Sequence, residues 1–171
     1  MTDFNPAPPA DTGAEPGSLV PAGWWRRAKA VIIDILIWFA AGLIPLVMLI
    51  VGLVFALDDE IGGESSGVGW LLFFIGVVAC AGVMVWGGWK FGWRQGVTGT
   101  TPGKNRLGIR LVDIATGEAP GGARGLGRWV VPSLINSVLN VFQLIDYLWP
   151  LWDDENQRVT DKMFKTRVVE A

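Results

Sequence analysis

The sequence predicts an all-α membrane protein with two transmembrane helices, a third membrane-associated helical segment and a small cytoplasmic β-hairpin-like element. Three observations predict this class. Apolar residues make up 51% of the 171 residues, which is high for a water-soluble domain. Two apolar stretches are long enough to cross the ~30 Å hydrocarbon core of a bilayer. Ten tryptophans accompany them, and indole rings favour the boundary between hydrocarbon and headgroups.

Residues 1–23 are predicted to form a disordered, proline-rich tail. The segment holds five prolines and three acidic residues, and its few apolar side chains show almost no periodicity. Such a composition buries too little apolar surface to offset the entropy lost on ordering. Its acidic start and the late, long apolar run that follows do not match a signal peptide.

The two apolar stretches predict helices at about 26–57 and about 68–93, within a membrane domain of residues 24–169. At about 1.5 Å per residue, the first helix exceeds the thickness of the hydrocarbon core, which allows it to tilt. The second carries no charged residue as far as Trp89 and is also long enough to span.

Basic residues predict which ends of these helices face the cytoplasm. The loop at 58–67 is acidic and has no lysine or arginine, whereas seven basic residues lie within 90–128. Arg26 and Arg27 lie at the start of the first helix. Because positively charged flanks stay in the cytoplasm, we expect the N-terminus and the loop at 94–127 to be cytoplasmic.

The loop at 94–127 contains one predicted strand, in which Leu107, Ile109 and Leu111 alternate with polar or small residues. A second β-like run at 166–169 could pair with it. These two runs are the basis of the predicted β-hairpin-like element.

The stretch "GTTPGKN" at 99–105 has a superficial likeness to a phosphate-binding loop. Its glycines are one residue too close, no serine or threonine follows Lys104, and a membrane helix precedes it instead of a strand. We interpret its central Pro-Gly pair as a turn. Lys104, Arg106 and Arg110 would then face anionic lipid headgroups.

The third apolar segment, at 128–152, carries a polar residue every three or four positions. On a helix these residues form one polar stripe: Ser133, Asn136, Ser137, Asn140, Gln143 and Asp146 or Tyr147. Three arrangements stay open: a third spanning helix, a helix in the headgroup plane, and a broken pair that bends near 136–140 and turns back. Basic residues in the final segment, 153–171, favour a cytoplasmic C-terminus.

Arg27 and Asp34 are the charges in the first helix that need explanation. Seven residues is close to two helical turns, so both side chains project from one face, about 10 Å apart. That gap is too long for a pair within the helix, so each needs a partner elsewhere. An unpaired carboxylate inside the membrane costs up to ~3 kcal/mol. Two roles stay open for Asp34: a structural salt bridge, or a titratable site on a proton or cation pathway.

Gly88, Gly92 and Gly96 recur every four residues near the end of the second helix. Small residues at this spacing allow a neighbouring helix to approach closely, so we interpret them as a packing face, with a hinge as the alternative. The neighbour could be the first helix or a second copy of the chain.

The composition argues against several classes of function. The chain has no histidine and one cysteine, Cys80, which lies in an apolar run and is interpreted as a packing residue. The commonest general base and metal ligand is therefore missing, and we expect no enzyme activity, no bound metal and no cofactor. The net charge of −2 provides no basic field for nucleic acid.

The stretches "AGWWRRAKAVIID", "GTTPGKNRLGIRLVD" and "NQRVTDKMFKTRVV" occur in this order along the chain. Together they resemble the RDD family of small bacterial membrane proteins, named for an arginine and two aspartates. By this resemblance the arginine corresponds to Arg27 and the aspartates to Asp34 and Asp161. Thr160 stands where the family usually has a histidine, so no mechanism that needs that imidazole is supported here.

The resemblance implies a multi-pass protein of the bacterial inner membrane, with transport suggested and sodium–proton exchange reported for some relatives. If Asp161 belongs with Arg27, both must lie on the cytoplasmic side. We therefore expect Arg27 to pair with Asp161, and Asp34 to face Arg128 or the polar stripe that ends at Asp146.

The sequence is compatible with two functions. The first is transport or exchange of protons, sodium or another small cation through the intramembrane carboxylate of Asp34. Two or three helices cannot enclose a polar path by themselves, so this function requires a homo-oligomer. The alternative is a non-catalytic accessory or assembly subunit that packs, within the lipid bilayer, against a larger membrane complex.

Overall fold

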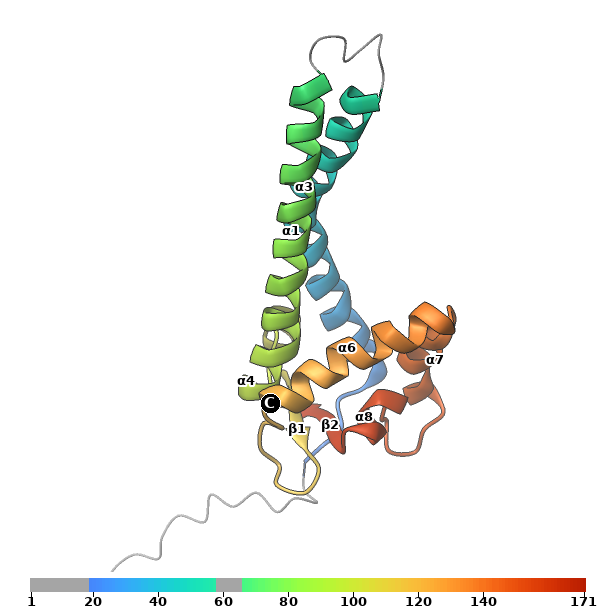
Figure 1. The fold of residues 1–171 in the computed structure, drawn as a ribbon. Helices are drawn as coiled ribbons and strands as arrows, with labels where there is room; N and C mark the ends of the chain where they lie inside the picture. The colour runs from blue at the N-terminus through green and yellow to red at the C-terminus, as the bar shows by residue number, and fades with distance from the viewer. Residues whose placement is uncertain (1–18, 58–65) are drawn as a thin grey trace, which may run out of the picture.

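A computed structural model describes residues 19–57 and 66–171 (Figure 1). Two long helical legs form a hairpin that rises from a second unit, which we call the base and define as residues 19–23 and 99–171. The elements of the two legs are α1 (Trp24–Leu57) in the first, and α3 (Ser66–Gly87), the π-helical turn η2 (Gly88–Trp93) and α4 (Arg94–Thr98) in the second. The elements of the base are α5 (Pro102–Arg106), β1 (Ile109–Asp113), α6 (Gly122–Val138), α7 (Phe142–Leu148), the 3₁₀ turn η3 (Trp149–Leu151), α8 (Val159–Met163) and β2 (Thr166–Glu170).

Both legs of the hairpin are long and apolar enough to cross a membrane. The most apolar windows of Trp24–Leu57 and Gly67–Thr98 have mean hydropathies of 2.7 and 2.5, and only 6% and 11% of their residues are buried. The core helix of a water-soluble domain would be mostly buried, so this exposed apolar surface fits a hydrocarbon surrounding. The prediction of two long apolar helices is confirmed, although the second ends at Thr98 instead of 93.

The upper part of the hairpin is packed backbone against backbone. A Cβ atom added at Gly52 would lie 2.3 Å from the Phe73 nitrogen, and one added at Gly76 would lie 2.5 Å from the Leu49 nitrogen. Glycine at both positions therefore permits the close approach of α1 and α3. No side chain fits between the two backbones at these levels.

The predicted packing face on the second leg contacts α6. A Cβ atom at Gly88 would touch the Trp129 ring, and one at Gly96 would lie 2.2 Å from the Gly121 carbonyl oxygen. Gly92 lies against Leu126 and Trp129 in the same way. The neighbour is thus neither the first helix nor a second copy, because α6 crosses the foot of this leg (Figure 1).

The region at 94–127 is not the loop that we predicted. It contains α4, α5 and β1, and α6 already begins at Gly122 instead of at 128. Thr101 caps α5 by accepting a hydrogen bond from the Lys104 backbone nitrogen at 3.2 Å, with Pro102 at the first helical position. The Pro-Gly pair that we interpreted as a turn is therefore the first turn of a short helix.

The base contains the small antiparallel sheet that the sequence predicted. Leu111 of β1 pairs with Val168 of β2. The two strands are not consecutive, because α6, α7 and α8 lie between them in the chain, so the sheet is not a β-hairpin. Ala30 of α1 packs on this sheet and joins the small core of buried apolar residues.

The end of the predicted disordered tail is ordered. The backbone nitrogen of Ala22 donates to the Val168 oxygen at 3.0 Å, and the Glu170 nitrogen donates to the Val20 oxygen at 3.0 Å. Ala22 is fully buried. The prediction for 1–23 is therefore wrong at 20–22, because β2 offers backbone partners there; residues 1–18 lie outside the described residues.

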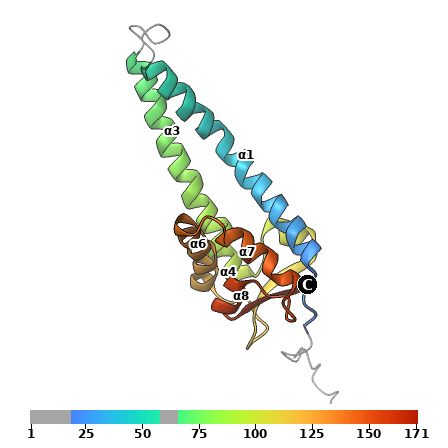
Figure 2. The same cartoon turned by 90° about the vertical axis from the view of Figure 1, so that its right-hand side faces the viewer.

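The third apolar segment is a broken pair of helices. α6 ends at Val138 and α7 begins at Phe142, so the chain turns at 139–141 and the two helices point in different directions (Figure 2). This geometry matches the bent arrangement among the three that the sequence left open. Neither helix reaches the length and hydropathy of a membrane span within the described chain. Apolar side chains around the break are exposed: Leu134, Val138, Leu139, Val141 and Leu144.

Candidate functional site

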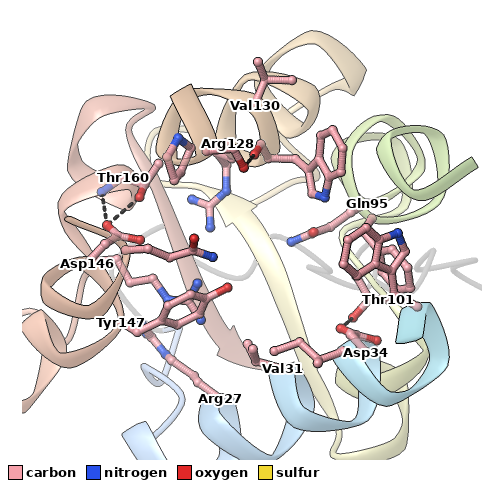
Figure 3. A pocket seen from close by; sticks show the side chains of 18 of the residues that line it. Arg27, Val31, Asp34, Gln95, Thr101, Arg128, Val130, Asp146, Tyr147 and Thr160 are labelled. Atoms are coloured by element: carbon pink, nitrogen blue, oxygen red, sulfur yellow. Dashed lines mark hydrogen bonds between the residues drawn. The ribbon is translucent and has the colours of Figure 1, made fainter. Parts of the chain in front are cut away.

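A pocket of about 460 Å³ lies at the foot of the hairpin, between the lower ends of its legs and the helices α6 and α7 (Figure 3). Its polar lining includes Arg27, Asp34, Gln95, Thr101, Lys104, Arg128, Asp146, Tyr147, Arg158 and Thr160. Its apolar lining includes Val31, Ile35, Trp38, Met84, Trp129 and Leu134. Of the five charged residues weighed as ion-pathway or structural candidates, Arg27, Asp34, Arg128 and Asp146 therefore line one cavity; the fifth, Asp161, lies beside it.

Arg27 joins three parts of the chain that are distant in sequence. Its Nε donates to the Ala22 oxygen and its Nη2 to the Val168 oxygen, both at 2.9 Å. Its Nη1 lies 3.5 Å from Oδ2 of Asp161. The guanidinium is 3% exposed, so these contacts replace solvent for a buried charge. The ion pair that we expected between Arg27 and Asp161 is present.

Asp161 is fully buried and binds a second arginine, Arg128 of α6. Its Oδ2 also accepts a hydrogen bond from the Arg158 backbone nitrogen at 3.1 Å, which caps α8. Burial opposes ionisation of the Asp161 carboxyl, but the surrounding guanidinium groups, chiefly Arg128, outweigh this cost and hold its pKa below the usual range. Asp161 is therefore an anion between α1 and α6.

Asp34 binds α5 and not α6. Its Oδ2 accepts a hydrogen bond from Thr101 Oγ1 at 2.5 Å, and its Oδ1 accepts one from the Gly103 nitrogen at 2.8 Å. A Cβ atom on Gly103 would lie 2.1 Å from the Ala30 oxygen, so α5 is in direct contact with the α1 backbone. Our expectation that Asp34 faces Arg128 or the polar stripe is wrong, because the capped end of α5 lies nearer.

Asp146, at the end of the polar stripe, joins α7 to α8. It is 2% exposed, and its Oδ1 accepts hydrogen bonds from the backbone nitrogen of Thr160, at 2.7 Å, and from the Thr160 hydroxyl. Thr160 thus has a structural contact at the position where an imidazole was expected from the family pattern. The residue earlier in the stripe, Asn136, accepts from the Gln143 nitrogen at 3.2 Å and so bridges the break.

Lys104 is buried in the pocket and does not face headgroups from the surface. Its side chain is 8% exposed, and the Gln95 amide accepts from its Nζ in the orientation that satisfies both groups. Burial lowers the pKa of the Lys104 ammonium well below its ordinary value, and the charges of Arg128 and Arg158 lower it further. Sequence reasoning wrongly placed Lys104 at the surface, although the Thr-Pro pair before it is a recognisable start of a helix.

Arg158 is the fourth cation of the pocket. Its guanidinium lies over the Tyr147 ring, 4.0 Å from the ring centroid. Among residues 19–57 and 66–171, neither Arg158 nor Lys104 has a carboxylate oxygen within 4.0 Å. In the same part of the chain no group of three or more His, Cys, Asp or Glu side chains is placed to hold a metal ion.

These features define an α-helical membrane-type protein whose polar base is fixed to an apolar hairpin by buried charges. The chain belongs to the RDD family, which it matches over residues 21–165. Arg27, Asp34 and Asp161, the residues that carry the resemblance, all lie within the matched region.

Two mycobacterial proteins are among the relatives. The proline-rich antigen of Mycobacterium leprae is 33% identical over 103 residues, which cover 60% of this chain and 39% of that protein. The proline-rich antigen homolog of Mycobacterium tuberculosis is 33% identical over 78 residues, or 46% of this chain and 31% of that protein. The chain thus matches less than half the length of either relative. No solved structure matches it.

Proposed function

We propose that the chain is a non-catalytic accessory subunit of a larger membrane complex. In this role the hairpin anchors the chain and packs against other membrane helices, while the base is held rigidly at the membrane surface. One observation carries the proposal: Arg27, Asp34 and Asp161 all bind groups within the chain. Their contacts fix α1 to α5, to α8 and to β2, and so hold the base rigidly against the hairpin.

The packing of the hairpin supports the same role. An ion path through hydrocarbon needs a polar lining, because unsatisfied polar groups there cost several kcal/mol. Gly52 and Gly76 bring the two backbones into contact, which leaves no such lining between the legs at these two levels. The outward faces are apolar, and side chains such as Val78 and Val85 are 71% and 74% exposed.

The proposal includes an orientation. We place the base and both described ends of the chain on the cytoplasmic side of a bacterial inner membrane. Support comes from Arg26, Lys90 and Arg94, which cluster at the foot of the hairpin. The exposed apolar bend at 139–141 would then rest in the membrane interface beside α1.

Site-specific photo-crosslinking in native membranes tests the accessory role. A photoreactive residue at Val78 or Val85 should give one discrete product with another protein, since the two positions are seven apart on one exposed face. The same residue at Arg106, on the exposed side of α5, serves as the control and should not give that product. Products between copies of this chain alone would contradict an accessory role.

Cation transport is the second candidate, because Asp34 lines the pocket at the foot of the hairpin. A path through the bilayer would then require several copies of the chain. Ion flux into proteoliposomes, under imposed proton and sodium gradients, tests this with Asp34→Asn beside the wild type. Flux that disappears in the variant would favour transport, whereas absent flux in both folded proteins would leave the accessory role.

A further inference from the structure

Among the described residues, the basic side chains at the floor of the pocket outnumber the carboxylates around them by four to three. Arg27 and Arg128 share the carboxylate of Asp161, while Asp34 and Asp146 are bound by neutral donors. Two further basic side chains, Lys104 and Arg158, also line the floor without a carboxylate within 4.0 Å among the described residues. Lys104 is buried and Arg158 is half-buried, so an anion that reaches both would gain a charge-assisted hydrogen bond from each of them.

The wall of the pocket is apolar and opens toward the region of hydrocarbon. Ile35 and Trp38 of α1 form one side and Leu134 of α6 the other. Ile35 is 53% and Leu134 63% exposed, so the wall continues onto the outer apolar surfaces of α1 and α6. With α1 as a membrane span, the proposal below places this opening where headgroups give way to acyl chains.

We propose that this pocket binds the headgroup of one anionic phospholipid. The lipid phosphate lies against Lys104 and Arg158, and the first part of an acyl chain follows Ile35 toward the hairpin. A volume of about 460 Å³ suits a headgroup and is too small for a whole lipid, so the chains must leave through the open wall. The proposed lipid site does not depend on the accessory role, because all of its lining residues belong to this chain.

Binding of single lipids to the purified full chain tests the proposal. Dissociation constants are measured in zwitterionic detergent micelles for a fluorescent phosphatidylglycerol and for a phosphatidylcholine with the same label. We expect tighter binding of the anionic lipid, with about tenfold loss in Lys104→Gln and in Arg158→Gln, the effect of one charge-assisted hydrogen bond. Arg106→Gln, an exposed position two residues from Lys104 on α5, is the matched control and should bind as the wild type does.

Equal affinity for the two lipids, or equal loss in Arg106→Gln, would overturn the proposal. Inorganic phosphate distinguishes a bound lipid from a bound free anion, because it should compete only weakly with the fluorescent phosphatidylglycerol. Competition at the affinity of the lipid would show that the apolar wall does not contribute to binding. A phosphatidylglycerol with a photoreactive group near the headgroup end of its acyl chain should label α1 or α6 at the wall. This labelling needs only the wild-type chain, so it tests the proposal even if a variant fails to fold. Labelling confined to the upper hairpin would overturn the proposal.

Discussion

The carboxylate of Asp34 on α1 accepts a hydrogen bond from the hydroxyl of Thr101 at 2.5 Å, across 67 residues of sequence. The same hydroxyl accepts from the Lys104 backbone nitrogen and so begins α5. One hydroxyl thus links the formation of a short helix to the burial of a carboxylate in an apolar leg. This contact offsets part of the cost of placing Asp34 there.

The link between Asp34 and Thr101 should appear as coupling in a double-mutant cycle. Asp34→Ala and Thr101→Val should each destabilise the chain, and the double variant should lose less than the sum by about 1–2 kcal/mol. The free energy of unfolding in detergent micelles measures this. Thr98→Val removes an exposed hydroxyl that bonds locally to the Arg94 oxygen, so it should show no coupling with Asp34→Ala.

Arg27→Gln should destabilise the chain by about 3–5 kcal/mol, because it removes one partner of a buried ion pair. Combining it with Asp161→Asn should cost clearly less than the sum of the two changes. Arg26→Gln is the matched control: Arg26 pairs with Glu170 at 2.7 Å, but both side chains are about half exposed, so the loss should stay below about 1 kcal/mol. Strict additivity of Arg27→Gln and Asp161→Asn would contradict a direct pair.

Lys104 should make stability depend on pH. Its pKa in the folded chain lies well below the ordinary 10.5, so between these two values the unfolded chain binds one more proton. Stability therefore rises with pH across this window. Lys104→Met should remove that rise, being more stable than the wild type at the lower end and similar to it above pH 10.5. Unfolding titrations measure this; Lys29→Met, at an exposed position, should keep the slope.

Gly96→Ala should separate α4 from α6. The added Cβ atom would lie 2.2 Å from the Gly121 oxygen and 2.9 Å from the Gly125 Cα, both of them backbone atoms that cannot rotate away. We expect a loss of about 1–3 kcal/mol in the free energy of unfolding. Gly82→Ala lies on the same leg with no atom within 4 Å of the added group, and should be close to neutral. Equal effects of the two changes would argue against the packing of α4 on α6.

Sequence reasoning succeeded where a charge or an apolar run restricts the answer strongly. The two legs of the hairpin were predictable because few other folds tolerate such long exposed apolar helices. The pairing of Arg27 with Asp161 was predictable for two reasons. Both residues match the arginine and aspartate that name the RDD family, and each buried charge needs a partner. The pairing of β1 with β2 followed from period-two alternation at Leu111 and at the end of the chain.

The features that sequence reasoning missed depend on contacts between segments whose own sequences give no clear structural signal. The stretch from Gly121 to Gly127 reads as a loop because glycine is a poor helix former, yet it begins α6. Its glycines are required there by the close approach of Gly96 to Gly125, which periodicity does not reveal. Likewise α5 has five residues, too few to show a helical period, so the donors that bind Asp34 were not found.

The contacts of Arg27 also determine when the chain can finish folding. Its acceptor on Val168 is added 141 residues later, so at 5–20 residues per second the ribosome needs on the order of ten seconds to supply it. Until then Arg27 has its acceptor on Ala22 but lacks its partners on Val168 and Asp161, so the base closes around this guanidinium only near the end of translation. A substitution in the final strand would leave the newly made chain open at this point and exposed to quality-control proteases, although its two apolar helices are already complete.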